Sequence, residues 1–381
     1  MKAIIHISDH PFYAGAIRED FKTLPLSLPF KMGIHPEYSI PRLILNDEIK
    51  IALEKLYEIG SFVSTPLGES DLSTLRMNQF SDKLISVMGG DVSGKKLLEI
   101  GCGNGTLLNE LKKKEAIVKG IEIGPQANVA IEKYGLEIHK EILSKEIISE
   151  KFDCIFSYGC LEHIDDLGSF FEQSRACLKN NGLFFHLVPN SELSFLEFNL
   201  DHLIHQHINY FTPRNGVKLF HSQGFINSSI SLTKNKNELM IWGFLDEKTT
   251  YKWPLEIQKE ELNNLKKYGN GLNIKQNNIK MKLDEMINKG ESIGFYAGGE
   301  EYGYNYKNFK NIRYFDGDEY KVGMKWLSGL PRIEPPKNLV KNKVDKLIIC
   351  RPHYFEDIYN NLVKMGVNPE TIINIEELNC L

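Results

Sequence analysis

The sequence predicts an α/β protein built on a parallel sheet with helices on both faces. From residue 96 onward, short apolar runs alternate with segments that have helical spacing, and this alternation is typical of such a sheet. The same rhythm restarts after residue 290, so a second and smaller α/β unit is expected. The length of 381 residues also exceeds what one hydrophobic core usually supports, which favours two or three domains.

Composition narrows the class of protein. The hydrophobic share of 42% and the charged share of 25% are those of a soluble globular protein. A net charge of −4 without a long basic run argues against nucleic acid as the main partner. The six cysteines are scattered and form no CxxC pair, which fits a reducing cytoplasm better than a zinc knuckle or a disulfide framework. Neither a signal peptide nor a run of roughly 18 apolar residues is found, so we expect a cytoplasmic protein that does not enter a membrane.

The N-terminal part is expected to be irregular before it becomes helical. Five of the fifteen prolines lie in the first 41 positions, which predicts loops and short extended pieces over residues 1–45. Residues 46–60 and 70–90 have the apolar spacing of helices, and the second helix should be capped by Ser70 or Asp71.

The central and C-terminal parts carry the predicted strands. Those of the core are residues 96–101, 116–123, 152–159 and 182–189. Residues 226–233 and 238–245 read as an antiparallel hairpin, and residues 254–289 as a solvated connecting helix or helix pair. The strands of the second unit are residues 292–300, 312–318, 346–352 and 371–375. The predicted domains are an N-terminal substrate or lid region (1–69), the core (70–248), a helical connector (249–289) and a C-terminal domain (290–381).

A glycine-rich turn, LLEIGCGNGTLL, occupies residues 97–108. Gly101, Gly103 and Gly105 provide the dihedral freedom that a chain needs to turn from a strand into a helix close to a ligand. Glu122 follows twenty-one residues after Gly101, at the end of the next predicted strand. A carboxylate at that place can accept both hydroxyls of a ribose. A generic tight strand-to-helix turn is the alternative interpretation.

Glu99, two residues before the first glycine, indicates the kind of ligand. A carboxylate there would repel a pyrophosphate and attract an ammonium group. The stretch therefore resembles the first motif, E-x-G-x-G-x-G, of the class I S-adenosylmethionine-dependent methyltransferases. The resemblance implies a seven-stranded, doubly wound, Rossmann-like core with S-adenosyl-L-methionine as cofactor, bound by Glu99, Gly101, Gly103, Gly105 and Glu122.

The resemblance continues along the core. Residues 152–166 look like the fourth strand of that family and the loop that faces the transferred methyl group, and Leu161, Glu162 and His163 match its LEH pattern. Glu141 stands where the family usually places an acid for the adenine amino group. A solvated charge is an equally good interpretation of Glu141.

The stretch HLIHQHINYF, residues 202–211, contains three histidines and a tyrosine. A histidine here could remove a proton from the methyl acceptor, because imidazole titrates near neutral pH. It could instead cap a strand and bond to backbone. A metal site needs three converging ligands. If residues 205–207 are extended, His205 and His207 share a face, whereas His202 joins His205 only in a helix. We therefore expect no metal.

The core, the HQHINYF stretch and the second α/β unit together are similar to the sugar C-methyltransferases that act on nucleotide-linked keto-deoxysugars. In that family the stretch reads Y-H-E-H followed by an aromatic pair, which Tyr210 and Phe211 match. The resemblance implies His207 as general base, His163 and His205 as hydrogen-bonding partners, and Gln206 as a group that orients the substrate.

Several positions depart from that family. Ile204 replaces its tyrosine and Gln206 its glutamate, which takes away a group able to accept a proton. No cysteine precedes Cys102, so the four-cysteine zinc site of the family is absent. AGGEEYG replaces the usual small-residue-plus-lysine pattern of the C-terminal unit, although Gly298 and Gly299 follow a strand and could hold a nucleotide.

The expected function is methyl transfer from S-adenosylmethionine to a small polar metabolite, above all C-methylation of a nucleotide-linked sugar. A sugar or natural-product O-methyltransferase, a non-catalytic module that binds S-adenosylmethionine or a nucleotide, and a nicotinamide oxidoreductase are the alternatives; Glu99 argues against the last. The loop after residue 60 is expected to close over the donor through Phe62 or Ser64. The remaining N-terminal candidates are expected to be surface or loop residues: His6, Asp9, His10 and His35.

Overall fold

The computed structural model describes residues 1–13, 15–60, 65–146, 148–200, 202–246, 248 and 255–379, with side chains from Gln258 onward in the last range. Its internal contacts divide the chain into two compact units. The first contains residues 1–6 and most of 30–266, and the second contains residues 7–29 and 267–381. The domain boundaries predicted from the sequence stay predictions.

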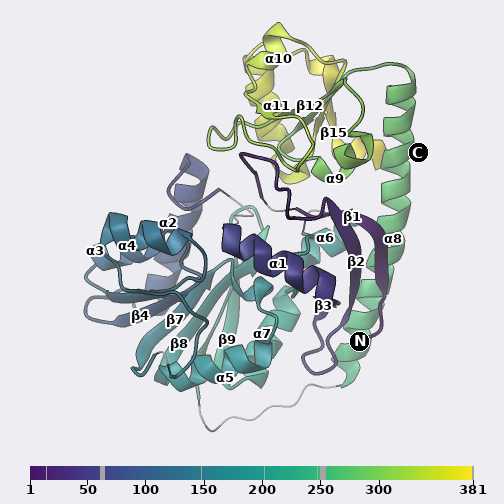
Figure 1. Ribbon diagram of the computed structural model, residues 1–381. Helices are drawn as coiled ribbons and strands as arrows, with labels where there is room; N and C mark the ends of the chain where they lie inside the picture. Colours follow the sequence, from purple (N-terminus) through teal and green to yellow (C-terminus); the bar gives the residue numbers. More distant parts are fainter. Residues whose placement is uncertain are drawn as a thin grey trace. The chain divides into compact units, whose positions relative to one another are not determined.

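The first unit is built on a mixed sheet. Within the described residues this sheet has seven strands in the order β6-β5-β4-β7-β8-β10-β9 (Figure 1). Their bounds are β4 (Lys96–Ile100), β5 (Ile117–Ile121), β6 (Ile138–His139), β7 (Phe152–Tyr158), β8 (Leu178–Pro189), β9 (Phe225–Leu232) and β10 (Glu238–Leu245). The strands from β6 to β8 pair in parallel, while β10 is antiparallel to both β8 and β9, which confirms the predicted hairpin.

The strand order indicates at which point along the edge of this sheet a ligand is expected to bind. After β4 the chain builds β5 and β6 on one side, and it then returns to build β7 and β8 on the other. Ligands of open α/β sheets bind at the carboxyl ends of the strands where the order reverses. That point lies between β4 and β7.

Helices cover both faces of the sheet (Figure 1). Successive residues of β4 and β7 alternate between two cores, because side chains of a strand point to opposite faces. Phe171 of α5 and Phe220 of α7 pack in one core, and Phe80 of α2 and Leu107 of α3 pack in the other. The helices are α1 (Asp47–Ile59), α2 (Asp71–Val87), α3 (Thr106–Lys113), α4 (Gln126–Tyr134), α5 (Leu167–Cys177), α6 (Ser191–Glu197) and α7 (Pro213–Ser222).

Local capping explains where the predicted helices begin. The Ser70 hydroxyl accepts the Ser73 backbone N–H at 3.2 Å, and the Ser73 hydroxyl accepts the Ser70 N–H at 3.0 Å. This reciprocal pair satisfies two backbone donors that the first turn leaves open, so Ser70 is the cap of α2. Asn46 caps α1 in the same manner, with its side chain accepting from Ile49 N.

The N-terminal residues are more regular than predicted. They form a three-stranded sheet of β1 (Ile5–Pro11), β2 (Ser27–Ile34) and β3 (Pro41–Leu43). Pro11 ends β1 and Pro41 begins β3, where a missing backbone donor is tolerated. His6 and Asp9 are exposed as predicted, but His10 is only 5% exposed, so its assignment to the surface was wrong.

The second unit contains a five-stranded parallel sheet in the order β13-β12-β11-β14-β15. Its strands are β11 (Ile293–Tyr296), β12 (Ile312–Phe315), β13 (Ile333–Glu334), β14 (Lys346–Ile349) and β15 (Ile372–Asn374). Its helices are α9 (Glu300–Gly303), α10 (Asn338–Lys341) and α11 (Phe355–Lys364), with short 3-10 helices η2 (Tyr304–Tyr306), η3 (Pro352–Tyr354), η4 (Pro369–Thr371) and η5 (Ile375–Asn379).

Residues 254–289 were predicted as a solvated helix or helix pair, and the structure has one helix, α8 (Leu255–Asn288). This helix is not solvated all round. It buries an apolar stripe at intervals of three, four and seven residues, formed by Leu265, Tyr268, Leu272, Ile279 and Leu283. In the described part of the chain, no helix is both long and apolar enough to cross a bilayer.

Candidate functional site

The loop from β4 to α3 has the backbone that its glycines predicted. Gly101, Gly103 and Gly105 have φ values of 70°, 54° and 75°, in the left-handed region that side chains rarely adopt. A Cβ atom at Gly101 would lie 2.9 Å from the Cys160 sulfur, and one at Gly105 would lie 2.6 Å from the Ala130 Cβ. Both the dihedral angle and the available space therefore require glycine at these two positions.

Two carboxyl groups stand at this loop. Glu122, directly after β5, accepts the Gly103 N–H at 2.9 Å and the Gly124 N–H at 2.7 Å, so its carboxylate is fixed beside the glycines. Glu99 is 1% exposed, and its Oε2 atom has no hydrogen-bond partner among the described residues. Burial, with the charge of Glu122, raises the pKa of Glu99 well above its usual range.

These observations fit the amino-acid end and the ribose of S-adenosylmethionine. Leaving a buried polar atom unsatisfied costs about 1–3 kcal/mol, and more for a charged group. An ammonium group that donates to Glu99 Oε2 would remove that cost and stabilise the ionised carboxylate. Glu122 has acceptor positions beyond the two that the backbone occupies, because a carboxylate accepts about four hydrogen bonds.

A groove lies next to Glu122. Its volume is about 590 Å³, and two of its lining residues, Ile123 and Ile142, are 52% and 77% exposed. Exposed apolar side chains of this size suit the faces of a planar base. Glu141 also lines the groove, which is compatible with the role that the resemblance implied. The other lining residues are Lys140, Leu143, Ser144, Ser169 and Gln173.

A second group of polar side chains follows β7. There the chain forms the 3-10 helix η1 (Leu161–His163), one strand away from the glycine loop in the sheet order. The Ile208 and Asn209 N–H groups both donate to the Glu162 carbonyl, at 2.7 and 2.9 Å. The segment 202–211 is thereby held against η1, although the two are more than forty residues apart in the sequence.

Arg42 of β3 ties the same region together. Its guanidinium donates to the Asn209 side-chain oxygen at 2.9 Å and forms an ion pair with Asp165. The Leu43 N–H donates to the Ile208 carbonyl at 2.9 Å, so backbone contacts support the side-chain contacts. Burial lowers the pKa of Arg42, and the two aspartates Asp165 and Asp166 oppose that shift.

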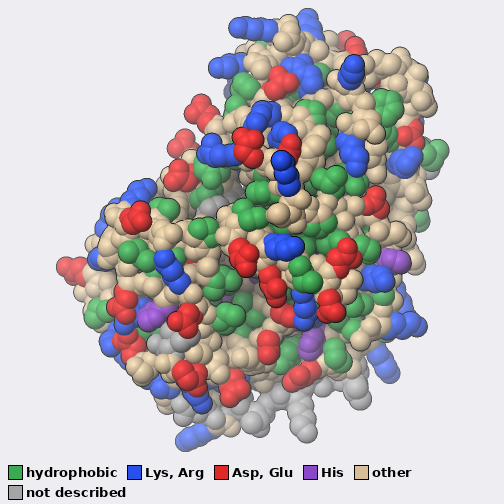
Figure 2. All heavy atoms as spheres, in the orientation of Figure 1, with side chains coloured by type: hydrophobic (Ala, Val, Ile, Leu, Met, Phe, Trp, Pro, Cys, Tyr) green, Lys and Arg blue, Asp and Glu red, His purple; other side chains and the backbone are tan. Residues whose placement is uncertain are grey.

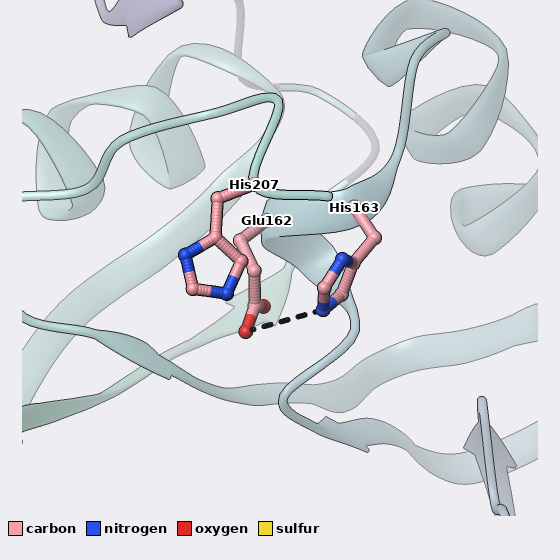
Figure 3. A group of neighbouring side chains, drawn as sticks. All are labelled: Glu162, His163 and His207. Atoms are coloured by element: carbon pink, nitrogen blue, oxygen red, sulfur yellow. Dashed lines mark ion pairs between the residues drawn. The ribbon is translucent and has the colours of Figure 1, made fainter. Parts of the chain in front are cut away.

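His163 and His207 are oriented in the same way. The Nδ1 atom of His163 lies 2.7 Å from the Gln206 carbonyl, and the Nδ1 atom of His207 lies 3.0 Å from the His202 carbonyl. A carbonyl only accepts, so both Nδ1 atoms carry the proton and both Nε2 atoms keep a lone pair. Figure 3 shows the two rings on either side of the Glu162 carboxyl group. Their ring centroids are 5.2 Å apart.

Burial governs the charges of this cluster, which we define as Glu162, His163 and His207. It lowers the pKa of His163 to about 4 and that of His207 well below its usual range, so both imidazoles are neutral at pH 7. Burial and the charge of Glu238 raise the pKa of Glu162 to about 8. The Glu162 side chain is almost fully buried, and its Oε2 atom has no hydrogen-bond partner among the described residues.

The structure does not bring His205 and Gln206 into this cluster. The condition for His205 and His207 to share a face is not met, because the His207 N–H donates to the Ile204 carbonyl at 3.0 Å and residues 205–206 form a turn. His205 is fully buried and packs edge-on against Phe30. Gln206 contributes its backbone carbonyl to His163, while the role of its side chain stays a prediction.

One residue near the cluster was missed. The Tyr57 hydroxyl is shielded from solvent and has no hydrogen-bond partner among the described residues. Burial and the charges of Cys160 and Glu162 raise its pKa, which places the hydroxyl near the cluster. Its position in the amphipathic pattern of α1 made it look like an ordinary packing residue. Phe62 and Ser64, the residues that were predicted for this role, lie outside the described residues.

The glycine loop and the cluster are neighbours. Cys160 contacts the loop at Gly101, and a Cβ atom at Gly159 would lie 3.6 Å from Glu162 Oε1. After burial, the largest influences that raise the pKa of the Cys160 thiol are the charges of Glu162, Glu122 and Glu99. Cys160 therefore lies between the glycine loop and the cluster.

In the second unit, Gly298 and Gly299 form a tight turn after β11. Their φ values are 134° and 90°, and a Cβ atom at Gly299 would lie 2.7 Å from the Phe295 ring. The Arg351 guanidinium at the end of β14 lies 3.2 Å from the Cβ position of Gly298. Nucleotide binding at this turn stays a prediction.

Comparison with known proteins finds a match over part of the first unit. Residues 75–230 match a family model described as a methyltransferase domain. The match covers less than half of the chain, and over these residues the chain is similar to methyltransferase domains.

The curated relatives cover part of the chain. Ubiquinone biosynthesis O-methyltransferase from Histophilus somni is 34% identical over 127 residues, which are 30% of this chain and 53% of that protein. The protein of the same name from Pelagibacter ubique is 33% identical over 110 residues, 27% of this chain and 45% of that protein. The chain thus spans about half the length of the curated relatives it matches.

Solved structures resemble the chain more distantly. A 1,6-didemethyltoxoflavin-N1-methyltransferase from Burkholderia thailandensis has a TM-score of 0.40 at 16% identity, covering 63% of this chain and all of that one. The N-methyltransferase NodS from Bradyrhizobium japonicum has a TM-score of 0.39 at 15% identity, covering 53% of this chain and all of that one.

Proposed function

We propose that the whole chain transfers a methyl group from S-adenosylmethionine to an oxygen or carbon atom of a small polar metabolite. The observation that carries this proposal is the juxtaposition of two groups at the β4/β7 edge. The glycine loop with Glu99 and Glu122 is suited to the donor, and the cluster with its two Nε2 lone pairs is suited to the acceptor.

On the donor side, Glu122 accepts hydrogen bonds from ribose hydroxyls while the backbone N–H groups of Gly103 and Gly124 keep it in place. Glu99 binds the ammonium group, and the groove beside Ile123 and Ile142 receives the adenine. When bound, the donor supplies an electrophilic methyl carbon on a sulfonium. Holding this carbon in line with the acceptor atom lowers the barrier, because the reacting atoms are then oriented before the reaction.

On the acceptor side, His207 presents Nε2 to the acceptor and takes its proton, as the resemblance implied. His163 presents a second acceptor atom from the other side of Glu162 (Figure 3). The backbone carbonyls of His202 and Gln206 hold the two rings, so the geometry is set before the substrate binds. The acceptor forms a bond to the methyl carbon, the carbon–sulfur bond breaks, and its electron pair goes to sulfur.

The substrate class of this proposal is a nucleotide-linked sugar that is methylated on carbon beside a ketone. O-methylation is the second candidate, because relatives up to 34% identical are named O-methyltransferases and Gln206 replaces an acid of the sugar C-methyltransferases.

The test is to incubate the purified chain with S-adenosylmethionine and a panel of nucleotide-linked keto sugars, hydroxylated sugars and phenols, and to measure S-adenosylhomocysteine. Acid hydrolysis then separates the candidates, because a C-methyl group remains in a branched carbon skeleton. Binding of S-adenosylhomocysteine without turnover of any acceptor would favour a non-catalytic binding module.

A further inference from the structure

We propose that the cluster of Glu162, His163 and His207 binds one divalent first-row transition metal ion. The three side chains each offer a ligand atom, and these atoms lie within 4.8 Å of one another. The Nε2 atom of His163 and the Oε1 atom of Glu162 are already 3.8 Å apart. Metal–ligand bonds of about 2.0–2.2 Å place two ligands of one ion about 3.0–3.5 Å apart, so a small rotation of the side chains closes the site.

The orientation of the imidazoles supports the inference. A metal-binding histidine almost always donates its other ring N–H to a carbonyl or carboxylate, which fixes both the tautomer and the ring plane. Both histidines of the cluster already do so, through the Gln206 carbonyl at 2.7 Å and the His202 carbonyl at 3.0 Å. Their Nε2 atoms are thereby presented toward Glu162 as neutral ligands (Figure 3).

The Glu162 carboxyl group is an independent observation. Its side chain is 4% exposed, and its Oε2 atom has no hydrogen-bond partner among the described residues. Burial of a carboxylate without a partner is unfavourable, and a bound cation offsets that cost. The backbone carbonyl of Glu162 accepts from the Ile208 and Asn209 N–H groups, which holds the main chain of Glu162 next to the segment that carries His207.

The ligand set indicates the metal and its role. Two imidazole nitrogens and one carboxylate oxygen suit Zn²⁺, Fe²⁺ or Co²⁺ rather than Mg²⁺ or Ca²⁺, which prefer oxygen. Three protein ligands leave positions open, and open positions are typical of catalytic sites and not of structural ones. The glycine loop lies beside this cluster through Cys160.

The chemistry of the metal ion rests on the proposed function, and it specifies which atom of the acceptor reacts. A metal here would bind a hydroxyl or carbonyl oxygen of the substrate and stabilise its deprotonated form, the alkoxide or enolate. The proton would pass to solvent water, and the oxygen or the enolate carbon would then attack the methyl carbon. The metal keeps its oxidation state. With the ion bound, His207 would act as a ligand, and solvent water would accept the proton that the proposed function assigns to His207.

The sequence had indicated no metal because only His202, His205 and His207 were compared. Glu162 and His163 come from a loop more than forty residues earlier, and only the fold brings them to His207.

The test measures metal binding directly. Untagged full-length protein is stripped with a chelator and titrated with Zn²⁺ against a chromophoric competitor, and with Co²⁺ to read its visible absorption. We expect one ion per chain and the absorption of four- or five-coordinate Co²⁺. His163→Ala and His207→Ala should each weaken Zn²⁺ binding by more than the roughly 10- to 100-fold that follows loss of a supporting group. His221→Ala, in the last turn of α7, should change nothing.

Binding of S-adenosylhomocysteine to each variant serves as the check on folding, since the donor residues are untouched. Wild-type protein that binds no stoichiometric Zn²⁺ or Co²⁺, or that binds them equally well after loss of His163 and of His207, overturns the inference. Specific metal binding without methyl transfer to any acceptor would contradict the proposed function alone.

Discussion

Replacing Glu99 by glutamine tests which part of the donor this carboxyl group recognises. Glu99 is 1% exposed and its Oε2 atom has no partner among the described residues, so a bound ammonium would form a buried, charge-assisted hydrogen bond. Such a bond contributes about 1.5–3 kcal/mol. Glu99→Gln should therefore raise the Kd of S-adenosylhomocysteine roughly 10- to 150-fold.

A second ligand makes this prediction specific. 5′-Methylthioadenosine has the adenine, ribose and sulfur of the donor but lacks the amino-acid end. Glu99→Gln should leave its Kd within about twofold of that for wild type, whereas Glu122→Gln should weaken both ligands because both contain the ribose. Calorimetry on the two variants and the two ligands gives the coupling between each carboxyl group and the amino-acid end. The exposed Glu132→Gln is the matched control.

Two results would refute the reasoning. Equal weakening of both ligands by Glu99→Gln would mean that the substitution disturbs the loop and does not remove a specific contact. No change in either ligand would mean that the ammonium binds elsewhere, and the interpretation of the first motif would be wrong.

Three further predictions concern the same unit. Gly101→Ala should abolish donor binding, which calorimetry measures. It should also lower the free energy of unfolding by at least about 1–2 kcal/mol, the cost of a left-handed backbone for a residue with a side chain. The new Cβ atom would also lie 2.9 Å from the Cys160 sulfur, and denaturant unfolding measures the combined loss of stability. Donor binding at a pH below the raised pKa of Glu99 should release a proton, because an ammonium group stabilises the ionised carboxylate. The binding heat should then vary with the ionisation enthalpy of the buffer. Burial raises the pKa of Glu261 to about 7, so this group lowers the stability of the folded protein as the pH rises from about 4.5 to 7. Glu261→Gln should therefore stabilise the protein by up to about 3 kcal/mol at pH 8.

Each of these three predictions has a result that would contradict it. Normal donor affinity in Gly101→Ala would show that the loop tolerates a side chain. A binding heat that is independent of the buffer would show that Glu99 is already ionised. For Glu261 the sign is decisive: a carboxyl group whose folded pKa is raised costs stability only above its unfolded pKa. The gain from glutamine must therefore vanish near pH 4, and a gain that persists there would come from packing.

The sequence by itself determined the architecture of the first unit and the conformation of its glycine-rich loop. The alternation of apolar runs with helically spaced segments indicates the order of strands and helices along the chain. Each segment shows its type by the spacing of its own apolar residues, because that spacing reflects which face of the element is buried. The three glycines of residues 101–105 and the acids Glu99 and Glu122 lie within one βαβ unit, so their positions follow from local chain geometry. The hairpin of β9 and β10 was predicted for the same reason.

The tertiary structure decided the acceptor side. His205 and His207 alternate in the sequence, but a turn between them sends His205 to Phe30 and leaves His207 facing Glu162 and His163. Tyr57 resembled a packing residue until its hydroxyl was placed near Cys160 and Glu162. Contacts between residues far apart in the chain depend on the order of strands in the sheet and on buried hydrogen bonds. Neither of these leaves a periodic signal in the sequence.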